Sequence, residues 1–403
     1  MPSEIKVLPE DFFKNIFKYS FKEISFLIAD NLFNSDIPKS ELENIINSSI
    51  TFEAPLVPLN RKINILELFH GPTLAFKDFG ARFMANTLAY LNKNSNKEIT
   101  ILVATSGDTG SAVANGFYDV DGINVTLLYP SNKVSKIQEQ QLTTLDKNIT
   151  ALEVLGTFDD CQRLVKQAFL DKDITSIKKV SSANSINLAR LLPQSFYYFN
   201  AYAQLKDKNL QTIISVPSGN FGNLTAGLIA KKMGLPITKF IAATNSNDVF
   251  PKYLETSNYH PQPSIKTISN AMDVGDPSNF KRILDLYNHN HQLIKNDIYS
   301  KSFTDEETIT AMKEVYSNYN YIIDPHGAVG YLALNSYNEE LKLDSFNGII
   351  LETAHPGKFA DIVEKSLNRK IEIPARLKNC LTKEKHSIKI SNSYKDFKEF
   401  LLN

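Results

Sequence analysis

The chain has 403 residues, of which 42% are hydrophobic and 22% are charged, a composition typical of globular proteins with a buried core. At about 150 residues per domain, this length suggests two or three domains. Forty-four basic side chains balance 44 acidic ones, so no net field attracts nucleic acid or an anionic membrane, and any anion site must be local.

Cysteine and histidine usage argues against a disulfide framework and a metal site. Cys161 and Cys380 lie far apart without CxxC spacing. The pair His289 and His291 is more typical of a solvated helix end than of metal ligands. No apolar run reaches the ~18 residues of a membrane span, and the first residues lack the layout of a signal peptide. We therefore expect a cytoplasmic protein that binds no metal, nucleic acid or membrane.

Residues 1–70 are predicted to be mainly helical and amphipathic, as in "FKEISFLIADNLF" and "PKSELENIINSSI". Strands are predicted beyond them at "ITILVAT", "INVTLLYP", "ITALEVLG", "QTIISVP", "KFIAATN" and "FNGIILET". Helices are predicted at "SAVANGFYDV", "SKIQEQQLTTL", "FDDCQRLVKQAFL", "NLTAGLIAKKMG" and "GKFADIVEKSLNR". This alternation predicts an α/β fold with parallel sheets covered on both faces, whose ligands bind at the carboxyl ends of strands.

One polar stretch, from Ser246 to Asp276, interrupts the alternation and is rich in Pro, Ser and Asn. Its length is unusual for a passive connection. A lid and a surface excursion are the two interpretations that remain open.

The stretch "ELFHGPTLAFKDFGARFMA" places Lys77 between Phe76 and Phe79 at the start of a helical pattern. An isolated lysine there usually extends its amine into water. Apolar surroundings can instead favour the neutral amine, which is the form that reacts with an aldehyde. The lysine alone leaves both interpretations open.

The turn in "VATSGDTGSAVA" gathers hydroxyl groups and backbone amides where a strand ends and a helix begins. Its candidate residues are Ser106, Gly107, Asp108 and Thr109. Such a turn suits a carboxylate or a phosphate, although Asp108 could simply cap the helix.

The segment "SSANSINLARLLPQ" brings Asn184 and Ser185 to the start of a helix, with Arg190 one to two turns later. Amide, hydroxyl and guanidinium groups could together hold one anion. An arginine on a helix is, however, more often a surface group.

The segment "SVPSGNFGNLTAG" ends an apolar strand and opens a helix. Its turn consists of Gly219, Asn220, Phe221, Gly222 and Asn223. Glycines let backbone N–H groups converge, and the helix adds its unpaired N–H groups and positive dipole end, so the turn can hold a phosphate. It matches neither the Walker A sequence nor GxGxxG, and a tight connection without a ligand explains it equally well.

Together, the lysine and the turns fit pyridoxal phosphate. The cofactor aldehyde needs an amine for a Schiff base, its phosphate needs a glycine-rich helix start, and an amino-acid substrate needs a carboxylate site. Each requirement has a candidate in this chain.

The chain also resembles the threonine synthases, over nearly its whole length from Leu8 to Asn368. The matching segments are "HGPTLAFKDFGARFMA", "TSGDTGSAVA", "QEQQLTTL", "NSINLARLLPQ", "VPSGNFGNLTAGLIAKKMG", "MDVGDPSNFKR", "DPHGAVGY" and "ETAHPGKF". The resemblance implies the tryptophan-synthase-β-like architecture, fold type II, of pyridoxal-phosphate enzymes. We then expect a helical segment in 1–70, a smaller α/β domain with the cofactor lysine in 71–205, and a larger α/β domain with the phosphate loop and a C-terminal extension in 206–403.

By this resemblance, Lys77 is the cofactor lysine and the catalytic residue. The backbone amides of Gly219 to Asn223 bind the cofactor phosphate, and Asp108 lies near the cofactor's ring hydroxyl. Thr353, in "ETAHPGKF", faces the pyridine nitrogen. A hydroxyl in that place leaves the nitrogen largely unprotonated.

The resemblance implies conversion of O-phospho-L-homoserine and water to L-threonine and phosphate, the last step of threonine biosynthesis. The substrate carboxylate is then assigned to Ser106, Gly107 and Thr109, and the substrate phosphate to Asn184, Ser185 and Arg190. Lys77, as a neutral amine, removes the α proton and shuttles a proton at the β carbon. The only partner implied is this small molecule, and we expect a monomer or weak homodimer.

Two departures from the family pattern stand out. Relatives usually carry a short strand, a helix and a "GLF" or "GLY" segment before a stretch like "PSEIKVLP", so we expect that this segment is absent or that the start is misassigned. In "PSNKVSKIQ" relatives commonly have a glycine near Asn132, and a left-handed asparagine can serve the same turn.

Two other functions remain open. A phospholyase would release phosphate and 2-oxobutyrate without adding water. A catalytically inactive, threonine-synthase-like protein would bind a ligand without turnover, but the intact Lys77, Thr353 and anion turns argue against it.

Overall fold

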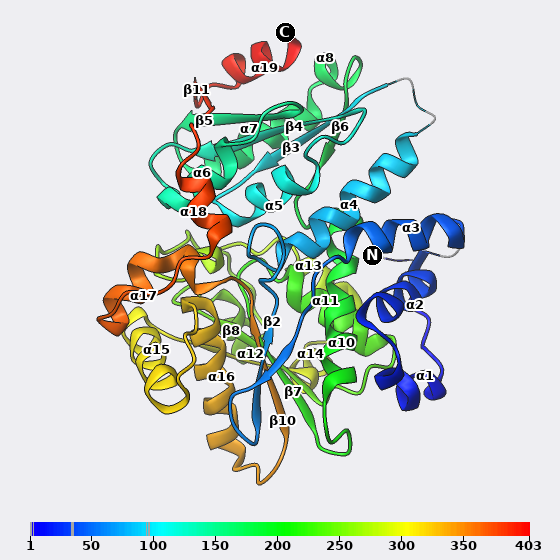
Figure 1. Ribbon diagram of the computed structural model, residues 1–403, viewed down its shortest axis with the longest axis vertical. Coiled ribbons are helices and arrows are strands. Elements are labelled where there is room, and N and C mark those ends of the chain that lie inside the picture. The colour runs from blue at the N-terminus through cyan, green and yellow to red at the C-terminus, as the bar shows by residue number, and fades with distance from the viewer. Residues whose placement is uncertain (1, 3, 34–35, 94, 96) are drawn as a thin grey trace. The chain divides into compact units, whose positions relative to one another are not determined.

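The computed structural model describes residues 2, 4–33, 36–93, 95 and 97–403. The chain forms two compact units. The first contains residues 1–43, 52–70 and 191–372, and the second contains residues 44–51, 71–190 and 373–403. Each unit has its own sheet with helices packed against it (Figure 1).

The sheet of the first unit has six strands in the order β1-β2-β10-β7-β8-β9. Its strands are β1 Leu56–Pro58, β2 Ile63–Glu67, β7 Thr212–Pro217, β8 Lys239–Thr244, β9 Ile298–Ser302 and β10 Asn347–Glu352. Only β1 runs antiparallel, pairing with β2, and the other neighbours are parallel. The central strands β7 and β10 are buried along their whole length, as continuous apolar runs predict.

Helices cover both faces of this sheet. The helices and helical turns of the first unit are α1 Glu10–Asn15, η1 Ile16–Lys18, α2 Phe21–Phe33, η2 Leu192–Ser195, α10 Phe196–Gln204, α11 Gly222–Lys232, α12 Val249–Thr256, η3 Asn270–Met272, α13 Phe280–Leu286, α14 His291–Asp297, α15 Asp305–Tyr319, α16 Pro325–Leu341, η4 Pro356–Phe359 and α17 Ala360–Leu367. On one face, the Ser215 hydroxyl of β7 donates to the Gly330 carbonyl of α16 at 2.7 Å. On the other, a Cβ at Gly227 of α11 would lie 2.7 Å from the Phe240 ring of β8, so glycine permits this close packing.

The sheet of the second unit has five parallel strands in the order β11-β5-β4-β3-β6. They are β3 Ile99–Ala104, β4 Ile123–Pro130, β5 Ile149–Leu155, β6 Lys179–Ser182 and β11 Ile388–Ser391. The helices of this unit are α4 Lys77–Asn92, α5 Asp108–Gly116, α6 Lys136–Thr143, α7 Phe158–Leu170, α8 Lys172–Thr175, α9 Leu188–Leu191, α18 Ala375–Leu381 and α19 Tyr394–Leu402, and α3 Lys39–Ser49 begins in the first unit and ends in this one.

Side chains of β3 alternate between two cores, as expected for a strand covered on both faces. Ile101 and Val103 pack with residues of α4 and α5, whereas Leu102 and Ala104 pack with residues of α7 and α19. The predicted parallel α/β sheets are therefore confirmed.

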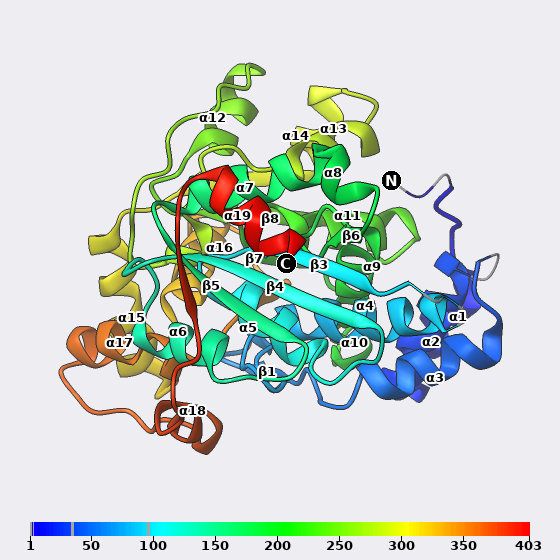
Figure 2. The ribbon, with the colours of Figure 1, turned by 90° about the horizontal axis from the view of Figure 1, so that it is seen from above.

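The last residues of the chain complete the second unit. Strand β11 extends the sheet beside β5, with Ile390 opposite Val154. The Arg163 guanidinium of α7 donates to the Asn392 carbonyl at 2.8 Å. Helix α19 then packs against α7 (Figure 2), where Leu401 is buried. The edge of the sheet is thus formed by residues far along the chain from its other strands.

The structure bears on three local features of the sequence. Asn132 adopts the left-handed conformation with φ of 57° that its place in the turn predicts. The His289 side chain is 70% exposed just before α14, as expected of a solvated helix end, whereas His291, the first residue of α14, is half-buried with Nε2 3.1 Å from the carbonyl oxygens of Tyr253 and Leu254. The polar stretch 246–276 contains α12 and η3 and belongs to the first unit. Across the described residues, no helix is long and apolar enough to cross a membrane.

Adjacent leucines of α19 provide a test of this packing. Leu401 is 2% exposed, whereas Leu402 is 41% exposed. We expect Leu401→Ala to lower the free energy of unfolding by about 3 kcal/mol because it leaves a cavity. Leu402→Ala, the matched control, should change it by less than about 0.5 kcal/mol. Urea unfolding followed by circular dichroism measures both, and equal effects would contradict this packing of α19.

Candidate functional site

Lys77 is the first residue of α4, and its amine is turned into the protein. Its side chain is 17% exposed, and Nζ lies 5.4 Å from the centroid of the Phe76 ring. Phe79 beside it is fully buried. Nζ also lies 4.0 Å from Oδ2 of Asp108, the first residue of α5. Lys77 is therefore held between an aromatic ring and a carboxylate and does not extend into solvent.

Arg190 is buried against the first turns of the lysine helix. A Cβ on Gly80 of α4 would lie 2.4 Å from the Arg190 carbonyl oxygen, so the two backbones touch. Burial lowers the pKa of Arg190 to about 10, and the nearby Asp78 partly offsets this effect. The guanidinium still carries its charge at neutral pH. Arg190 is thus not the surface group that a helical arginine usually is.

The turn after β3 is organised by the Thr105 hydroxyl. This oxygen accepts the backbone N–H groups of Gly107 at 3.0 Å and Gly110 at 2.8 Å. Gly107 has φ of 142°, in a region that favours glycine, and a Cβ there would lie 2.5 Å from the Gln138 side chain. Ser106 is exposed and Thr109 is half-buried, so their hydroxyls remain near the surface of the turn.

Gln138 of α6 fixes the orientation of Asp108. Its Nε2 donates to Asp108 Oδ1 at 3.2 Å, and Gln138 is itself held in a capping box with Ser135. The two oxygens of Asp108 therefore face different groups, Oδ1 the amide and Oδ2 the amine of Lys77. The N-cap of α5 is Gly107, so the interpretation of Asp108 as a simple helix cap is wrong.

Asn184 joins two strand ends. Its Nδ2 donates to the Ala104 carbonyl at the end of β3, at 3.3 Å, and its backbone N–H donates to the Ser182 hydroxyl at the end of β6. Ser185 follows it and is half-buried. The structure brings Asn184 to the same carboxyl edge of the sheet as the turn after β3, although its side-chain amide already has a protein acceptor.

The glycine turn of the first unit follows β7 and leads into α11. Phe221 caps α11 in the left-handed conformation, with φ of 58°, and its ring packs on Phe250 with centroids 4.7 Å apart. A Cβ on Gly219 would lie 2.6 Å from the Cα of Met272, so only glycine fits. Gly222 begins the helix, whose first N–H groups therefore point towards the turn.

The two asparagines of this turn use their side chains to hold it in place. Asn220 Oδ1 accepts from the backbone N–H of Ser278 at 2.6 Å. Asn223 Oδ1 accepts from the hydroxyls of Tyr197 and Tyr198 at 2.6 and 2.7 Å. Because these oxygens are engaged within the protein, an anion at the turn would meet mainly backbone N–H groups. The turn fits a phosphate on these grounds.

Thr353 follows directly after β10 and is buried. Strand β10 is the parallel neighbour of β7, with Ile350 opposite Ser215. Thr353 lies three residues after Ile350, and Ser218 lies three residues after Ser215, so the two are level with each other. The hydroxyl of Thr353 and the glycine turn consequently lie at the same carboxyl edge of the sheet.

A buried acidic pair lies next to Thr353. Oε1 of Glu352 accepts the backbone N–H of Asp324 at 2.6 Å, and Oε2 is buried with no hydrogen-bond partner among the described residues. Burial, and then the carboxylate of Asp324, raise the pKa of Glu352 well above its usual range. The Glu352 carboxyl therefore favours its neutral form.

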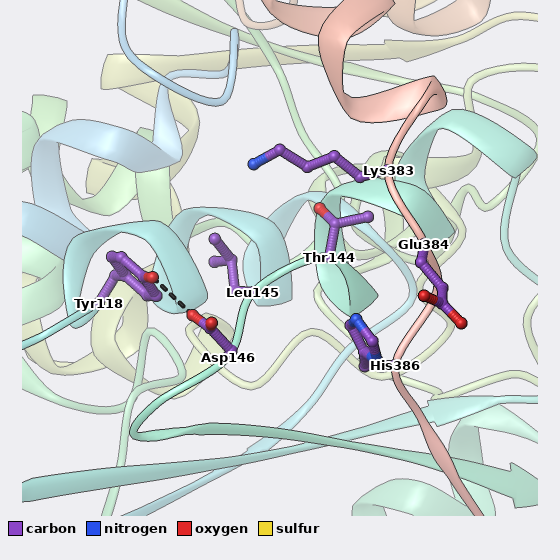
Figure 3. A pocket seen from close by; sticks show the side chains of 7 residues that line it. All are labelled: Tyr118, Thr144, Leu145, Asp146, Lys383, Glu384 and His386. Carbon is purple, nitrogen blue, oxygen red and sulfur yellow. Dashed lines mark hydrogen bonds between the residues drawn. The ribbon is translucent and has the colours of Figure 1, made fainter.

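A separate hollow of about 400 Å³ lies in the second unit. Figure 3 shows that its lining residues are Tyr118, Thr144, Leu145, Asp146, Lys383, Glu384 and His386. The Tyr118 hydroxyl donates to Asp146 at 2.6 Å, just before β5 begins. This hollow therefore lies at the amino end of the sheet, away from the edge where ligands of parallel sheets bind.

Sequence reasoning missed several residues that shape these turns. Asp78 accepts the backbone N–H and the hydroxyl of Thr73 at 2.8 and 2.5 Å and so fixes the approach to α4. Gln138 orients Asp108, and His326 lies beside Asp324. The only available signals were the helix-start pattern "SKIQ" and the Asp-Pro pair in "DPHG", which predict caps and not contacts across the fold.

Comparisons with known proteins give the family of the chain. Residues 50–349 match the family described as pyridoxal-phosphate dependent enzymes, and residues 327–401 match the threonine synthase C-terminal family. The threonine synthase of Buchnera aphidicola (Schizaphis graminum) is 44% identical over 403 residues, covering 100% of this chain and 92% of that protein.

Solved structures give the same result. The threonine synthase of Escherichia coli superposes on this chain with a TM-score of 0.93 and is 39% identical to it. The pyridoxal-phosphate-bound threonine synthase of Brucella melitensis superposes with a TM-score of 0.91 and is 31% identical. Each comparison covers 100% of this chain and 92% of the other.

The fold and these matches thus define a pyridoxal-phosphate-dependent enzyme of fold type II. Within that class, the chain belongs to the threonine synthase family.

The Gly219 contact predicts a specific loss of cofactor binding. We expect Gly219→Ala to weaken pyridoxal phosphate binding at least tenfold, because the added Cβ would displace the backbone at Met272. Titration of the apoprotein, followed by absorbance, measures the dissociation constant. Thermal unfolding of the apoprotein serves as the control for the fold, and wild-type affinity in a folded variant would contradict this prediction.

The raised pKa of Glu352 predicts a pH dependence of stability. The folded state holds this proton more tightly than the unfolded state, so wild-type stability falls as pH rises above the ordinary carboxyl pKa of 4.5. Glu352→Gln keeps an acceptor for Asp324 and removes the charge that Asp324 and Glu67 oppose. We expect the free energy of unfolding of the variant to fall less than that of the wild type as pH rises.

Urea unfolding at several pH values from about 5 to 9 measures this difference. Glu339→Gln, on the exposed side of α16, is the matched control and should follow the wild type. Parallel pH profiles for Glu352→Gln and wild type would contradict the assignment.

Proposed function

We propose that this threonine-synthase-family enzyme converts O-phospho-L-homoserine and water to L-threonine and phosphate. The observation that carries the proposal is the position of Lys77, whose mostly buried amine lies on the Phe76 ring and 4.0 Å from Asp108. Bound pyridoxal phosphate supplies an aldehyde for this amine and an electron sink for the substrate's α carbon.

We assign the cofactor to groups at strand ends and helix starts. Lys77 would hold the aldehyde covalently, and Asp108 would be the group for the ring hydroxyl. The backbone N–H groups of residues 219–223 would hold the phosphate, and Thr353 would be the group for the pyridine nitrogen. The buried Nδ2 of Asn223, which has no hydrogen-bond partner among the described residues, is a further donor in support of this turn.

The substrate is assigned to the second unit. Ser106, Gly107 and Thr109 hold its carboxylate through hydroxyl and backbone groups, although the Gly107 N–H is shared with Thr105. Asn184, Ser185 and Arg190 hold its phosphate. The buried charge of Arg190 supports this role because it can stabilise the departing phosphate more strongly than an exposed charge would.

Lys77 is the proposed acid and base. As a neutral amine it removes the proton from the substrate's α carbon and moves a proton at the β carbon. The phosphate leaves from the γ carbon, and water adds at the β carbon.

We further propose that the enzyme acts in the cytoplasm as a monomer or weak homodimer without a nucleic-acid partner. The balance of 44 basic and 44 acidic side chains supports the last point.

The lysine assignment is tested by absorbance and by product analysis. Wild-type protein should show a band near ~420 nm and form threonine from O-phospho-L-homoserine. Lys77→Ala should lose the band and slow turnover by about 1000-fold or more. The matched control is Lys93→Ala, which changes an exposed lysine at the other end of the same helix and should keep both properties.

Product identity separates the alternatives. Release of 2-oxobutyrate and phosphate without threonine would replace the proposal with a phospholyase. A wild-type protein that binds the cofactor without turnover would instead be a ligand-binding member of the family. A protein that takes up no pyridoxal phosphate would overturn the proposal.

A further inference from the structure

A chain of hydrogen bonds runs through the first unit from the end of β10 to the turn η3. It begins with the Glu352 carboxyl, which accepts the backbone N–H of Asp324 at 2.6 Å. Asp324 Oδ2 accepts from His326 Nδ1 at 2.7 Å. His326 Nε2 then accepts the backbone N–H of Ala271 at 3.2 Å. The side chains of Asp324, His326 and Glu352 are all buried.

These partners determine which nitrogen of His326 carries the proton. An N–H group faces Nε2, so that nitrogen must accept, and the ring hydrogen is on Nδ1, where it meets the Asp324 carboxylate. The ring is also packed on Phe359, with centroids 4.9 Å apart. His326 is thus held in one orientation by contacts at both ring nitrogens and on its face.

Asp324 in turn is held from three directions. Besides His326, its carboxylate accepts the backbone N–H of Gly327 and so caps α16, while its own N–H goes to Glu352. A Cβ on Gly327 would overlap Glu352 Oε2, so glycine is required for this carboxyl to fit. The position of His326 is therefore set by a helix start and by a central strand.

The backbone that His326 holds is the one that Gly219 touches. Ala271 and Met272 belong to η3, and a Cβ on Gly219 would lie 2.6 Å from the Met272 Cα and 3.1 Å from the Ala271 carbonyl oxygen. The glycine turn and η3 are therefore in close contact at Gly219.

Residues 278 and 279, a few residues after η3, make a second contact with the glycine turn. The Asn220 side chain accepts from Ser278, and the Asn279 side chain donates to the Asn220 carbonyl at 2.9 Å. Between these two contacts, Asp273 accepts hydrogen bonds from Thr267 and Asn245. His326 adds a hydrogen bond from α16 to this segment at Ala271, next to Met272.

We propose that His326 is a positioning residue for the cofactor phosphate, acting through its hydrogen bond to Ala271. The proposal rests on the assignment of residues 219–223 as the phosphate turn. The Nε2 acceptor fixes η3, η3 fixes Gly219, and Gly219 sets the direction of the backbone N–H groups that meet the phosphate. His326 itself touches neither cofactor nor substrate.

Two substitutions at one position separate this role from simple packing. His326→Asn places its amide near the Nδ1 site, so it keeps a donor for Asp324 and loses the acceptor for Ala271. His326→Gln reaches the Nε2 site and keeps an acceptor for Ala271. The matched control is His291→Asn, because His291 is a partly buried histidine of the same unit that also bonds backbone groups, at Tyr253 and Leu254 and not at η3.

The measurements are the dissociation constant of pyridoxal phosphate, the ³¹P resonance of the bound cofactor and the thermal midpoint of the apoprotein. We expect His326→Asn to weaken binding about tenfold or more and to shift the ³¹P signal. His326→Gln should stay within about threefold of wild type, and His291→Asn should bind as wild type even where its thermal midpoint falls.

Wild-type affinity and an unchanged ³¹P signal in His326→Asn would overturn the proposal, as would equal losses in the Asn and Gln variants. Hydrogen–deuterium exchange of the wild-type peptide 267–279 is a second measurement that needs no variant, and it should slow when pyridoxal phosphate is added. Unchanged exchange contradicts the proposal. Failure of the proposed function would appear in the wild type itself, as a protein that takes up no cofactor.

Discussion

The buried carboxylate of Asp324 is the interaction on which the first unit depends most. It caps α16, orients His326 and, through its backbone N–H, meets Glu352 at the end of β10. A buried carboxylate is costly unless it is fully hydrogen-bonded, and here the helix N-terminus supplies both a donor and a favourable dipole. Because α16 packs along β7 and β10, this cap sets the register of the helix against the strands that carry the glycine turn and Thr353.

Both units present the same physical arrangement at the carboxyl edge of a parallel sheet. Each has a turn in which a glycine permits a backbone path that no other residue could follow, at Gly107 by its φ of 142° and at Gly219 by its approach to Met272. Each turn opens a helix, so unpaired N–H groups gather where the strands end. In the second unit, side chains also take part, since Gln138 and Lys77 bond or approach the two oxygens of Asp108. The glycine turn therefore offers mainly backbone N–H groups for the proposed cofactor phosphate, whereas the turn after β3 adds side chains for the proposed proton transfer and substrate.

Much of this could be predicted from the printed sequence. Continuous apolar runs such as β7 predicted buried parallel strands, and glycine with small polar residues after them predicted the turns, because both signals are local. Lys77 could be recognised as a candidate for the same reason, since its aromatic neighbours stand beside it in the chain. The sequence left open whether Arg190 was a surface group, because the position of an arginine in a helical pattern does not determine its burial. Asp78 and Gln138 gave no signal of their roles, since their partners are defined by packing.

The sequence by itself determined the class of fold, the strand ends and the residue types at each turn, because backbone preferences and apolar periodicity act over a few residues. The tertiary structure decided which distant groups meet. It placed β11 beside β5, buried Arg190 against Gly80, and brought Ala271 to His326 across 55 residues. Those contacts depend on how helices pack on sheets, and the free energy of such packing is shared among many side chains. No short stretch of sequence therefore records it.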